Sequence, residues 1–327
     1  MSDVRVWRSF LFVPANSWKM LNKAAGEMED AVIFDLEDAC PVAERETGRI
    51  FARDIIPMFK SRGVDVLVRV NSLGTRATAD DLSIIATQGL DGVMLPKSES
   101  GEDIVELSEM LSREEIEKQI SSRINIVPLL ESPKGVMNAF EIGGASDRVC
   151  ALAFGAGDYM REMGEGFTIS KLTPDEYYPV LMYARSAIAV AACALGVPAI
   201  DTPFFGTLTD IEGLERETSK VKLLGFKGKM ITHPRHVETV NRLFSPSTED
   251  VQFSKRIVEE YKKIDALGKG AAVVDGKMID YAMYRMGIDL LSKAERIEGR
   301  LKMREQSGIE DLRLDTSPSL SYCDAQI

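Results

Sequence analysis

Four acidic residues follow short apolar runs in this sequence, at positions where they could bind a metal ion. Glu37 and Asp38 come after one run, Glu131 after a second, and Asp158 lies in a Gly-rich turn after a third. Mg²⁺ in proteins takes one or two direct carboxylates together with several waters. We therefore expect Glu131 and Asp158 to be the metal ligands, with Glu37 or Asp38 holding metal-bound waters. The alternative is that these acids are helix caps or surface charges.

Arg69 ends the apolar run VLVRV, where a positive charge is unfavourable without an anionic partner. A guanidinium at this place could bind the carboxylate or carbonyl oxygen of a substrate in a bidentate manner. Structurally, it could instead pair with Glu37 or Asp38. Both interpretations remain open from the residues alone.

Further candidates for substrate binding lie near other strand ends. The turn Gly155-Ala156-Gly157 offers backbone N–H groups at a helix start, suited to a carboxylate oxygen. Asn16 follows the first apolar run. Arg8, Lys19 and Lys97 could line an entrance for phosphate groups, although each could also be an ordinary surface charge.

These residues must be positioned by a repeated pattern of short apolar runs and helix-length segments. Runs without alternation are typical of parallel strands that are buried on both faces. We expect eight strands, at Ser9–Val13, Ala31–Leu36, Val66–Val70, Gly92–Leu95, Asn125–Leu130, Cys150–Phe154, Pro198–Ile200 and Lys229–Thr232. Such a pattern predicts an α/β fold, a (β/α)₈ TIM barrel, whose chemistry lies at the carboxyl ends of the strands.

The pattern changes after Ser245-Pro246-Ser247. We expect a barrel domain over residues 1–246, a C-terminal helical appendage over 247–298 and a flexible tail over 299–327. Asp280 is an obvious N-cap of the last helix in that appendage. The two histidines, His233 and His236, follow the eighth strand and are expected to be capping or packing residues.

The composition excludes several classes of function. A net charge of −11 and a pI near 5.0 argue against a general binder of nucleic acid or of an anionic membrane. The cysteines form no metal-binding spacing, and Cys150 and Cys193 are expected in the core. We find no signal peptide and no run that we expect to span a membrane, so we expect a cytoplasmic protein.

Ten segments together resemble the citrate lyase β-subunit-like (HpcH/HpaI aldolase/citrate lyase) family of the phosphoenolpyruvate/pyruvate superfamily. This family includes malyl-CoA and citramalyl-CoA lyases. The segments are RSFLFVPANS (8–17), DAVIFDLEDAC (30–40), VLVRVNS (66–72), GVMLPKSES (92–100), PLLESPKGVMNA (128–139), ALAFGAGDY (151–159), YARS (183–186), GKMITHP (228–234), VNRLFSPS (240–247) and DGKMID (275–280).

The resemblance implies roles for particular residues. Glu131 and Asp158 would bind Mg²⁺, with Mn²⁺ as a possible substitute, and Arg69 would contact a 2-oxo acid. The C-terminal helices would cover the site of a neighbouring subunit in a homotrimer or homohexamer. Asp280 from that neighbour would then be the general acid/base, so that a single chain would lack a complete site.

The activity implied is cleavage or formation of a 3-hydroxyacyl-CoA such as malyl-CoA, methylmalyl-CoA or citramalyl-CoA. The products would be a 2-oxo acid, glyoxylate or pyruvate, and a short acyl-CoA, with coenzyme A carried as part of the substrate. The alternatives are a malyl-CoA-type thioesterase and a citrate lyase β subunit acting on a carrier-bound citryl thioester. A non-catalytic CoA-binding scaffold ranks below these.

Overall fold

The computed structural model describes residues 6–164, 172–268 and 270–306. The chain divides into two compact units. One unit is Trp7–Arg242, and the described part of the other begins at Leu243 and ends at Gln306. Each unit is described by itself below.

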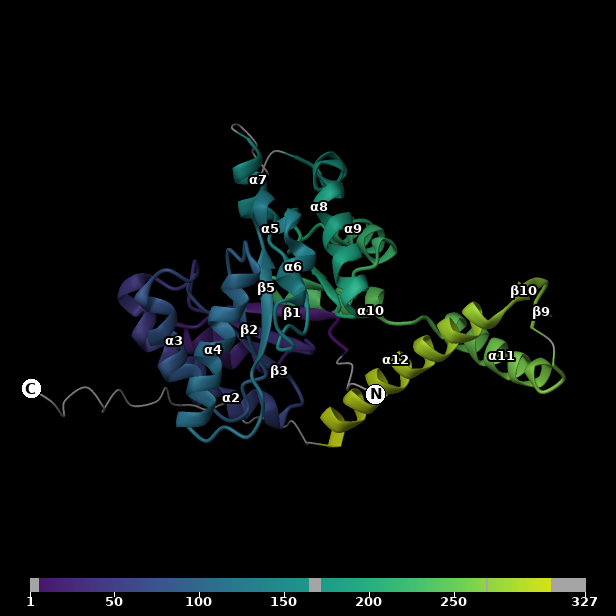
Figure 1. The fold of residues 1–327 in the computed structure, drawn as a ribbon, viewed down its shortest axis with the longest axis horizontal. Coiled ribbons are helices and arrows are strands. Elements are labelled where there is room, and N and C mark those ends of the chain that lie inside the picture. The colour runs from purple at the N-terminus through teal and green to yellow at the C-terminus, as the bar shows by residue number, and fades with distance from the viewer. Residues whose placement is uncertain (1–5, 165–171, 269, 307–327) are drawn as a thin grey trace, which may run out of the picture. The chain divides into compact units, whose positions relative to one another are not determined.

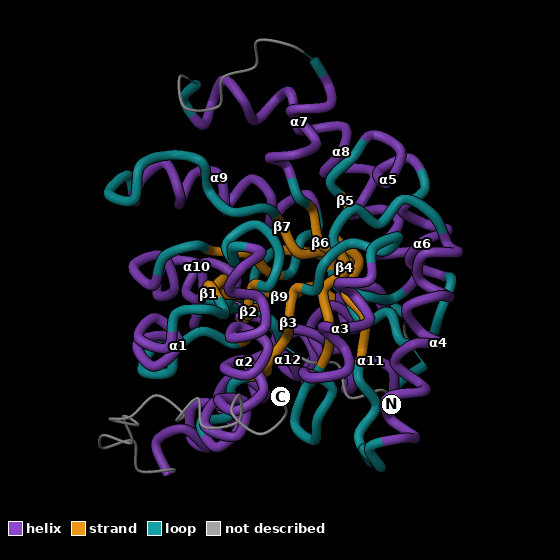
Figure 2. Tube along the Cα trace, turned by 90° about the vertical axis from the view of Figure 1, so that its left-hand side faces the viewer, coloured by secondary structure: helices purple, strands orange, loops and turns teal. Residues whose placement is uncertain are grey.

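Eight parallel strands close into a barrel in the first unit, in the order in which they occur along the chain. Figure 2 shows the strands gathered inside a ring of helices. The strands are β1 (Ser9–Pro14), β2 (Ala31–Asp35), β3 (Asp65–Arg69), β4 (Gly92–Leu95), β5 (Asn125–Leu130), β6 (Leu152–Phe154), β7 (Ala199–Asp201) and β8 (Gly228–Ile231). The predicted (β/α)₈ barrel is therefore confirmed, with all eight strands at the expected places.

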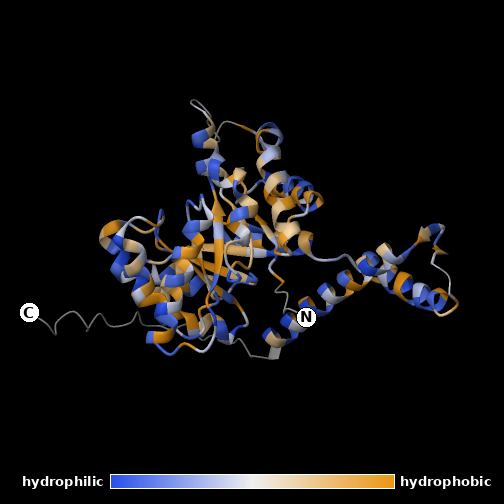
Figure 3. Ribbon diagram, in the orientation of Figure 1, coloured by the Kyte–Doolittle hydropathy of each residue, from blue (hydrophilic) through white to orange (hydrophobic). Residues whose placement is uncertain are grey.

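The strands are buried because both of their faces pack against apolar side chains. The strand residues that fill the barrel form one cluster, which includes Phe10, Ile33, Leu67, Val127 and Ile200. Figure 3 shows the hydrophobic colouring concentrated on these strands. A filled barrel interior leaves the strand ends as the place for a site.

Helices follow the strands in sequence and cover the barrel (Figure 1). They are α1 (Trp18–Ala24), α2 (Arg45–Ser61), α3 (Arg76–Ile85), α4 (Gly101–Glu117), α5 (Pro133–Met137), α6 (Ala139–Gly144), α7 (Ala156–Met163), α8 (Pro174–Leu195), α9 (Ile211–Leu224) and α10 (Val237–Phe244). Side-chain caps fix several starts. Ser17 accepts a hydrogen bond from Met20 N, and Asp210 accepts one from Gly213 N.

The longest helix of the barrel unit, α8, packs against α6, α9 and β7. It begins with a capping box between Thr173 and Glu176 and ends at Gly196, whose φ of 73° is left-handed. By length and composition alone, α8 could cross a membrane, contrary to the sequence expectation. Its fully buried Arg185 and its contacts with neighbouring helices instead identify it as a packed core helix.

Four charged side chains form a buried quartet between α8, α9, β7 and β8. Arg185 Nε lies 2.9 Å from Asp201 and its Nη2 lies 3.0 Å from Glu217. Lys229 Nζ lies 2.6 Å from Asp201 and 2.7 Å from Glu217. Two positive and two negative charges thus compensate each other in the interior, where an unpaired charge would be strongly unfavourable.

The second unit is built from two helices and a hairpin, α11 (Thr248–Asp265), β9 (Ala272–Val274), β10 (Lys277–Ile279) and α12 (Tyr281–Gln306). Ile257, Tyr261, Val274 and Ile279 form its core. Helix α12 continues to Gln306, so the prediction of a tail from residue 299 is wrong for residues 299–306. The rest of the predicted tail, residues 307–327, lies outside the described residues.

The cysteines differ in exposure from what the apolar runs predict. Cys193 is exposed and Cys150 is half-buried, whereas Cys40 is buried. The prediction for Cys193 is wrong because it lies on the outer face of α8, where small residues also occur. Cys323 lies outside the described residues.

Candidate active site

Glu131 lies immediately after β5 at the carboxyl end of the barrel, and its side chain is buried. Its Oε1 accepts a hydrogen bond from the backbone N–H of Lys97, at 2.8 Å. Burial, together with the charges of Glu37 and Asp158, raises the pKa of Glu131 to about 8. A carboxylate in such surroundings is well suited to bind a cation.

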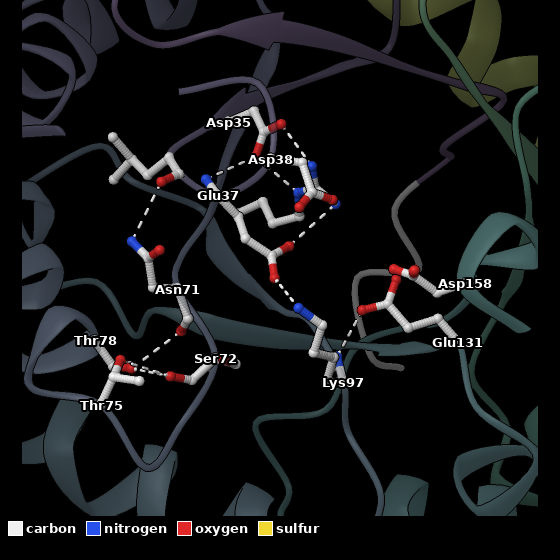
Figure 4. Close-up of polar contacts among 12 residues, drawn as sticks. Asp35, Glu37, Asp38, Asn71, Ser72, Thr75, Thr78, Lys97, Glu131 and Asp158 are labelled. Carbon is white, nitrogen blue, oxygen red and sulfur yellow. Dashed lines mark hydrogen bonds and ion pairs between the residues drawn. The ribbon is translucent and has the colours of Figure 1, made fainter. Parts of the chain in front are cut away.

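Asp158 lies in the first turn of α7, at the end of β6. Its carboxylate approaches that of Glu131 (Figure 4), and both residues line the same pocket. On its outer side, Asp158 pairs with Arg161 at 3.0 Å. The two residues predicted as metal ligands are therefore brought together.

Gly155 lies against the side chain of Glu131 and has no space for a side chain of its own. A Cβ at this position would lie 2.6 Å from the Glu131 Cβ and 2.7 Å from its Oε2. Gly157, by contrast, has nothing within 4 Å of such a Cβ. The glycine at 155 is thus required by the position of the Glu131 carboxylate.

Arg69 is the last residue of β3, and its guanidinium is bound by acids from the end of β2. Nε donates to Asp35 Oδ1 at 2.7 Å and Nη2 donates to Asp35 Oδ2 at 2.5 Å. Nη1 lies 3.2 Å from Glu37 and 3.4 Å from Asp38. The structural alternative of pairing with Glu37 or Asp38 is therefore observed, while Arg69 also lines the pocket.

Asp35 is a site residue that the sequence analysis missed. Besides binding Arg69, its carboxylate accepts hydrogen bonds from the backbone N–H groups of Glu37 and Ala39. It thereby fixes both the guanidinium and the turn that carries Glu37 and Asp38. Its signal in the sequence was an acid at the end of an otherwise apolar run.

Lys97 follows β4 and binds two of the acids. Its Nζ lies 2.8 Å from Glu37 Oε1, while its backbone N–H binds Glu131 (Figure 4). The hydrogen bond to Glu37 raises the pKa of Lys97. Lys97 is therefore part of the site, where it binds two acids; a role in binding phosphate groups stays a prediction.

A pocket of about 520 Å³ lies over these strand ends. Its polar lining includes Asp35, Asp38, Arg69, Glu131 and Asp158. Its apolar lining is formed by Phe12, Pro14, Met20, Leu129, Pro203, Phe205 and Met230. The size and the mixed lining suit a small oxo acid and the end of an acyl chain.

Three other residues that were predicted to bind substrate or phosphate groups do not line the pocket. The Asn16 side chain donates to Glu44, and Lys19 is exposed on α1. Neither lines the pocket. The prediction for Arg8 is wrong, because it precedes β1 at the opposite end of the barrel and pairs with buried Asp30 at 2.7 Å.

At the start of α7, the N-cap Gly155 and the helix residue Gly157 line the pocket. The N–H of Ala156 donates to Thr202 Oγ1 at 3.2 Å and is already engaged. Thr202 follows Asp201, which belongs to the buried quartet. The turn is thus attached to the end of β7.

The histidines and Asp280 have the predicted local roles. His233 accepts a hydrogen bond from Arg235 N, and buried His236 packs against Phe204. Asp280 is exposed and accepts a hydrogen bond from Met283 N at the start of α12. The capping role of Asp280 is confirmed.

The donor set fits a magnesium ion. Five acids, Asp35, Glu37, Asp38, Glu131 and Asp158, face two cations, Arg69 and Lys97. Across the described ranges, no group of three or more His, Cys, Asp or Glu forms a cation site. Mg²⁺ does not need such a group, because it prefers one or two carboxylates and takes its other oxygens from water and substrate. Glu131 and Asp158 provide two carboxylates.

Comparisons with known proteins agree with this geometry. The sequence profile described as HpcH/HpaI aldolase/citrate lyase matches residues 8–234. The citrate lyase subunit beta of Haemophilus influenzae is 33% identical over 282 residues, which cover 85% of this chain and 93% of that protein. A (3S)-malyl-CoA thioesterase of Cereibacter sphaeroides is 28% identical over 291 residues, covering 89% and 95%.

A solved structure is similar over nearly the same length. It is the protein CitE from Mycobacterium tuberculosis in complex with magnesium, acetoacetate and coenzyme A. The two structures have a TM-score of 0.69 and 29% sequence identity, and the match covers 88% of this chain and 97% of that one.

Proposed function

Because the chain belongs to the HpcH/HpaI aldolase/citrate lyase family, we propose that it is a Mg²⁺-dependent carbon–carbon lyase acting on a 3-hydroxyacyl-CoA. The substrate class is malyl-CoA, methylmalyl-CoA or citramalyl-CoA. The products are a 2-oxo acid, glyoxylate or pyruvate, and a short acyl-CoA. The observation that carries this proposal is the buried Glu131 beside Asp158 and Arg69 in one pocket.

The chain holds the metal through Glu131 and Asp158, and Glu37 or Asp38 accepts hydrogen bonds from its waters. When bound, Mg²⁺ supplies a Lewis acid toward the oxygens of the oxo acid. Glu37 Oε2 lies 3.2 Å from Arg69 Nη1, and a carboxylate oxygen in such a pair can still accept a hydrogen bond from a water. The donor set supports Mg²⁺, and we extend it to Mn²⁺, which takes similar oxygen ligands.

Arg69 stabilises the negative charge that develops on the oxo-acid oxygen. Two of its N–H groups are taken by Asp35 and its Nη1 lies beside Glu37 and Asp38, so the guanidinium lines the pocket in a fixed orientation. A preorganised donor of this kind does not need to reorient as the charge forms. The Gly155–Gly157 turn allows the oxo acid to approach the backbone closely.

Cleavage breaks the bond between C2 and C3 of the acyl chain. The C3 hydroxyl gives its proton to the general acid/base and becomes the carbonyl of the 2-oxo acid, while the electron pair of the broken bond remains on C2 as the enolate of the acyl-CoA. We assign protonation of that carbon to Asp280 of a neighbouring subunit. In the condensation direction, the same carboxylate removes a proton from the acyl-CoA.

This assignment requires a homo-oligomer, a trimer or a hexamer. Asp280 is exposed. The acids that line the described pocket are already assigned to the metal or to Arg69, and no histidine lines it, so we look for the acid/base outside this lining. The N-cap role of Asp280 leaves its second oxygen free for chemistry.

Two alternative functions are each favoured by one relative. The malyl-CoA thioesterase suggests that water attacks the thioester of the same substrate. The citrate lyase β subunit suggests a carrier-bound citryl thioester as substrate. A non-catalytic scaffold is disfavoured because Arg69, Glu131, Asp158 and Asp280 are all present.

A product assay separates these candidates. Purified protein is incubated with Mg²⁺ and, in separate reactions, malyl-CoA, methylmalyl-CoA, citramalyl-CoA and a carrier-bound citryl thioester. The acyl thioester, free CoA and oxo acid formed are measured. We expect acyl-CoA and oxo acid in equal amounts, and no turnover in EDTA. Free CoA without oxo acid would establish the thioesterase, and turnover of the carrier-bound thioester alone would establish the citrate lyase subunit. Full activity in EDTA would overturn the metal assignment.

A further inference from the structure

Lys97 connects the ends of three strands through two hydrogen bonds. Its backbone N–H, after β4, binds Glu131 Oε1 after β5, and its Nζ binds Glu37 Oε1 after β2, each at 2.8 Å. Figure 4 shows the lysine between these two acids. One residue thus holds a metal-binding carboxylate with its backbone and a second carboxylate with its side chain.

The backbone of Lys97 has a conformation that favours glycine. Its φ is 52°, and in the described part of the chain only two other non-glycine residues have a positive φ. A non-glycine residue is disfavoured in this region, because its Cβ comes too close to the following carbonyl oxygen. Glycine would relieve that cost and keep the N–H bond to Glu131, but it would lose the ammonium that binds Glu37.

Both oxygens of Glu37 face cations. Oε1 is taken by Lys97, and Oε2 lies 3.2 Å from Arg69 Nη1. The side chain is only 7% exposed, so few other partners can reach it. Glu37 and Glu131 also share a partner, because Lys97 binds Glu37 through its side chain and Glu131 through its backbone.

The number of direct carboxylates decides which cation such a site prefers. Mg²⁺ keeps several waters and takes one or two carboxylates in octahedral geometry, whereas Ca²⁺ accepts six to eight oxygens at longer distances. A third carboxylate entering the coordination sphere of Glu131 and Asp158 would therefore favour Ca²⁺. Glu37 is the acid that shares Lys97 with Glu131, and the ammonium of Lys97 holds one of its oxygens.

We propose that Lys97 is a positioning residue that keeps Glu37 out of direct metal coordination and so makes the site selective for Mg²⁺ over Ca²⁺. The inference rests on the proposed metal site at Glu131 and Asp158. It assigns to Lys97 a role in cation choice that is separate from the chemistry of the substrate.

The test is calorimetric titration of Mg²⁺ and Ca²⁺ into the purified full-length protein without substrate. Lys97→Met keeps most of the length of the side chain and the backbone N–H bond to Glu131, but it loses the charge. We expect the ratio of the Mg²⁺ and Ca²⁺ dissociation constants to shift toward Ca²⁺ by about tenfold. Adding Glu37→Gln to Lys97→Met should remove that shift, because the amide cannot replace the released carboxylate.

Three further variants separate the ammonium from other effects. Lys97→Gly relieves the left-handed backbone and should show the same shift as Lys97→Met. Lys97→Arg keeps the positive charge and should retain the preference for Mg²⁺. Lys134→Met is the matched control, because Lys134 also pairs with a glutamate at 3.4 Å, but that glutamate, Glu99, is not one of the acids of the site.

The outcomes distinguish the two proposals. An unchanged ratio in Lys97→Met, in a protein that melts like the wild type and binds Mg²⁺ through Glu131, overturns the role of Lys97 and leaves the metal site intact. A shift that persists in the double variant also overturns it. If Mg²⁺ binds equally to the wild type and to Glu131→Ala, the metal site and the inference are both wrong.

Discussion

The guanidinium of Arg69 lies in the plane of a two-point contact with Asp35, with Nε 2.7 Å from one carboxylate oxygen and Nη2 2.5 Å from the other. The two residues are register partners at the ends of β3 and β2. The guanidinium carbon of Arg69 also lies over the ring of Phe12, 5.1 Å from the ring centroid. Strand pairing, a carboxylate and an aromatic ring together fix the direction of this arginine.

Replacing Asp35 with asparagine should therefore destabilise the protein and weaken catalysis. Loss of the charged partner leaves Arg69 buried with weaker compensation, which we expect to cost about 3 kcal/mol in the free energy of unfolding. Urea denaturation measures this cost. The control is Asp54→Asn, in the exposed pair with Arg53, where we expect a change below about 0.5 kcal/mol. Equal effects of the two substitutions would contradict the role of Asp35.

A methyl group at Gly155 should disrupt the metal site, whereas one at Gly157 should not. The added Cβ at 155 meets the Glu131 side chain, and the resulting overpacking is expected to cost about 1–3 kcal/mol. Mg²⁺ affinity, measured by calorimetry, should fall for Gly155→Ala and remain near the wild-type value for Gly157→Ala. A Gly155→Ala protein with normal Mg²⁺ affinity would show that Glu131 does not bind the ion.

Mixing two inactive variants should partly restore activity. Glu131→Ala lacks a metal ligand and Asp280→Ala lacks the proposed acid/base, but a mixed oligomer contains interfaces with one intact copy of each. The acyl-CoA and oxo acid formed after subunit exchange measure this recovery. Exchange shown by mass spectrometry without any recovered activity would exclude Asp280 as an acid/base acting between subunits.

The cysteines should differ in their reaction with iodoacetamide. Burial, with a contribution from the charge of Asp35, raises the pKa of Cys40 to about 11. At pH 8 its thiol therefore stays protonated, and only the thiolate reacts. We expect peptide mapping at pH 8 to find Cys193 labelled and Cys40 unlabelled. Rapid labelling of Cys40 in the folded protein would contradict its burial.

The barrel was predictable because its strands are buried on both faces. That burial requires continuous apolar runs, and the runs located all eight strands. The acids after the runs followed from the same rule, since parallel strands end at one edge. Glu131, Asp158 and Arg69 were therefore found from the sequence.

The partners of these residues were harder to predict from the sequence. Asp35 ends its strand, so a search of the residues past each run did not reach it, and its pairing with Arg69 depends on strand register. Arg8 immediately precedes β1, and residues before parallel strands lie at the end of the barrel opposite to the site. The contact between Lys97 and Glu37 joins residues 60 positions apart, which no local pattern reveals.

The buried quartet of Arg185, Asp201, Glu217 and Lys229 constrains how this sequence can change over time. Losing any one member leaves an uncompensated buried charge, at a cost of about 3–5 kcal/mol, which is a large part of the stability of a typical domain. A single substitution at any of these four positions is therefore strongly destabilising and is expected to be selected against. We expect the four to be inherited as a unit among relatives, and to be replaced, where they are replaced, in charge-balanced pairs.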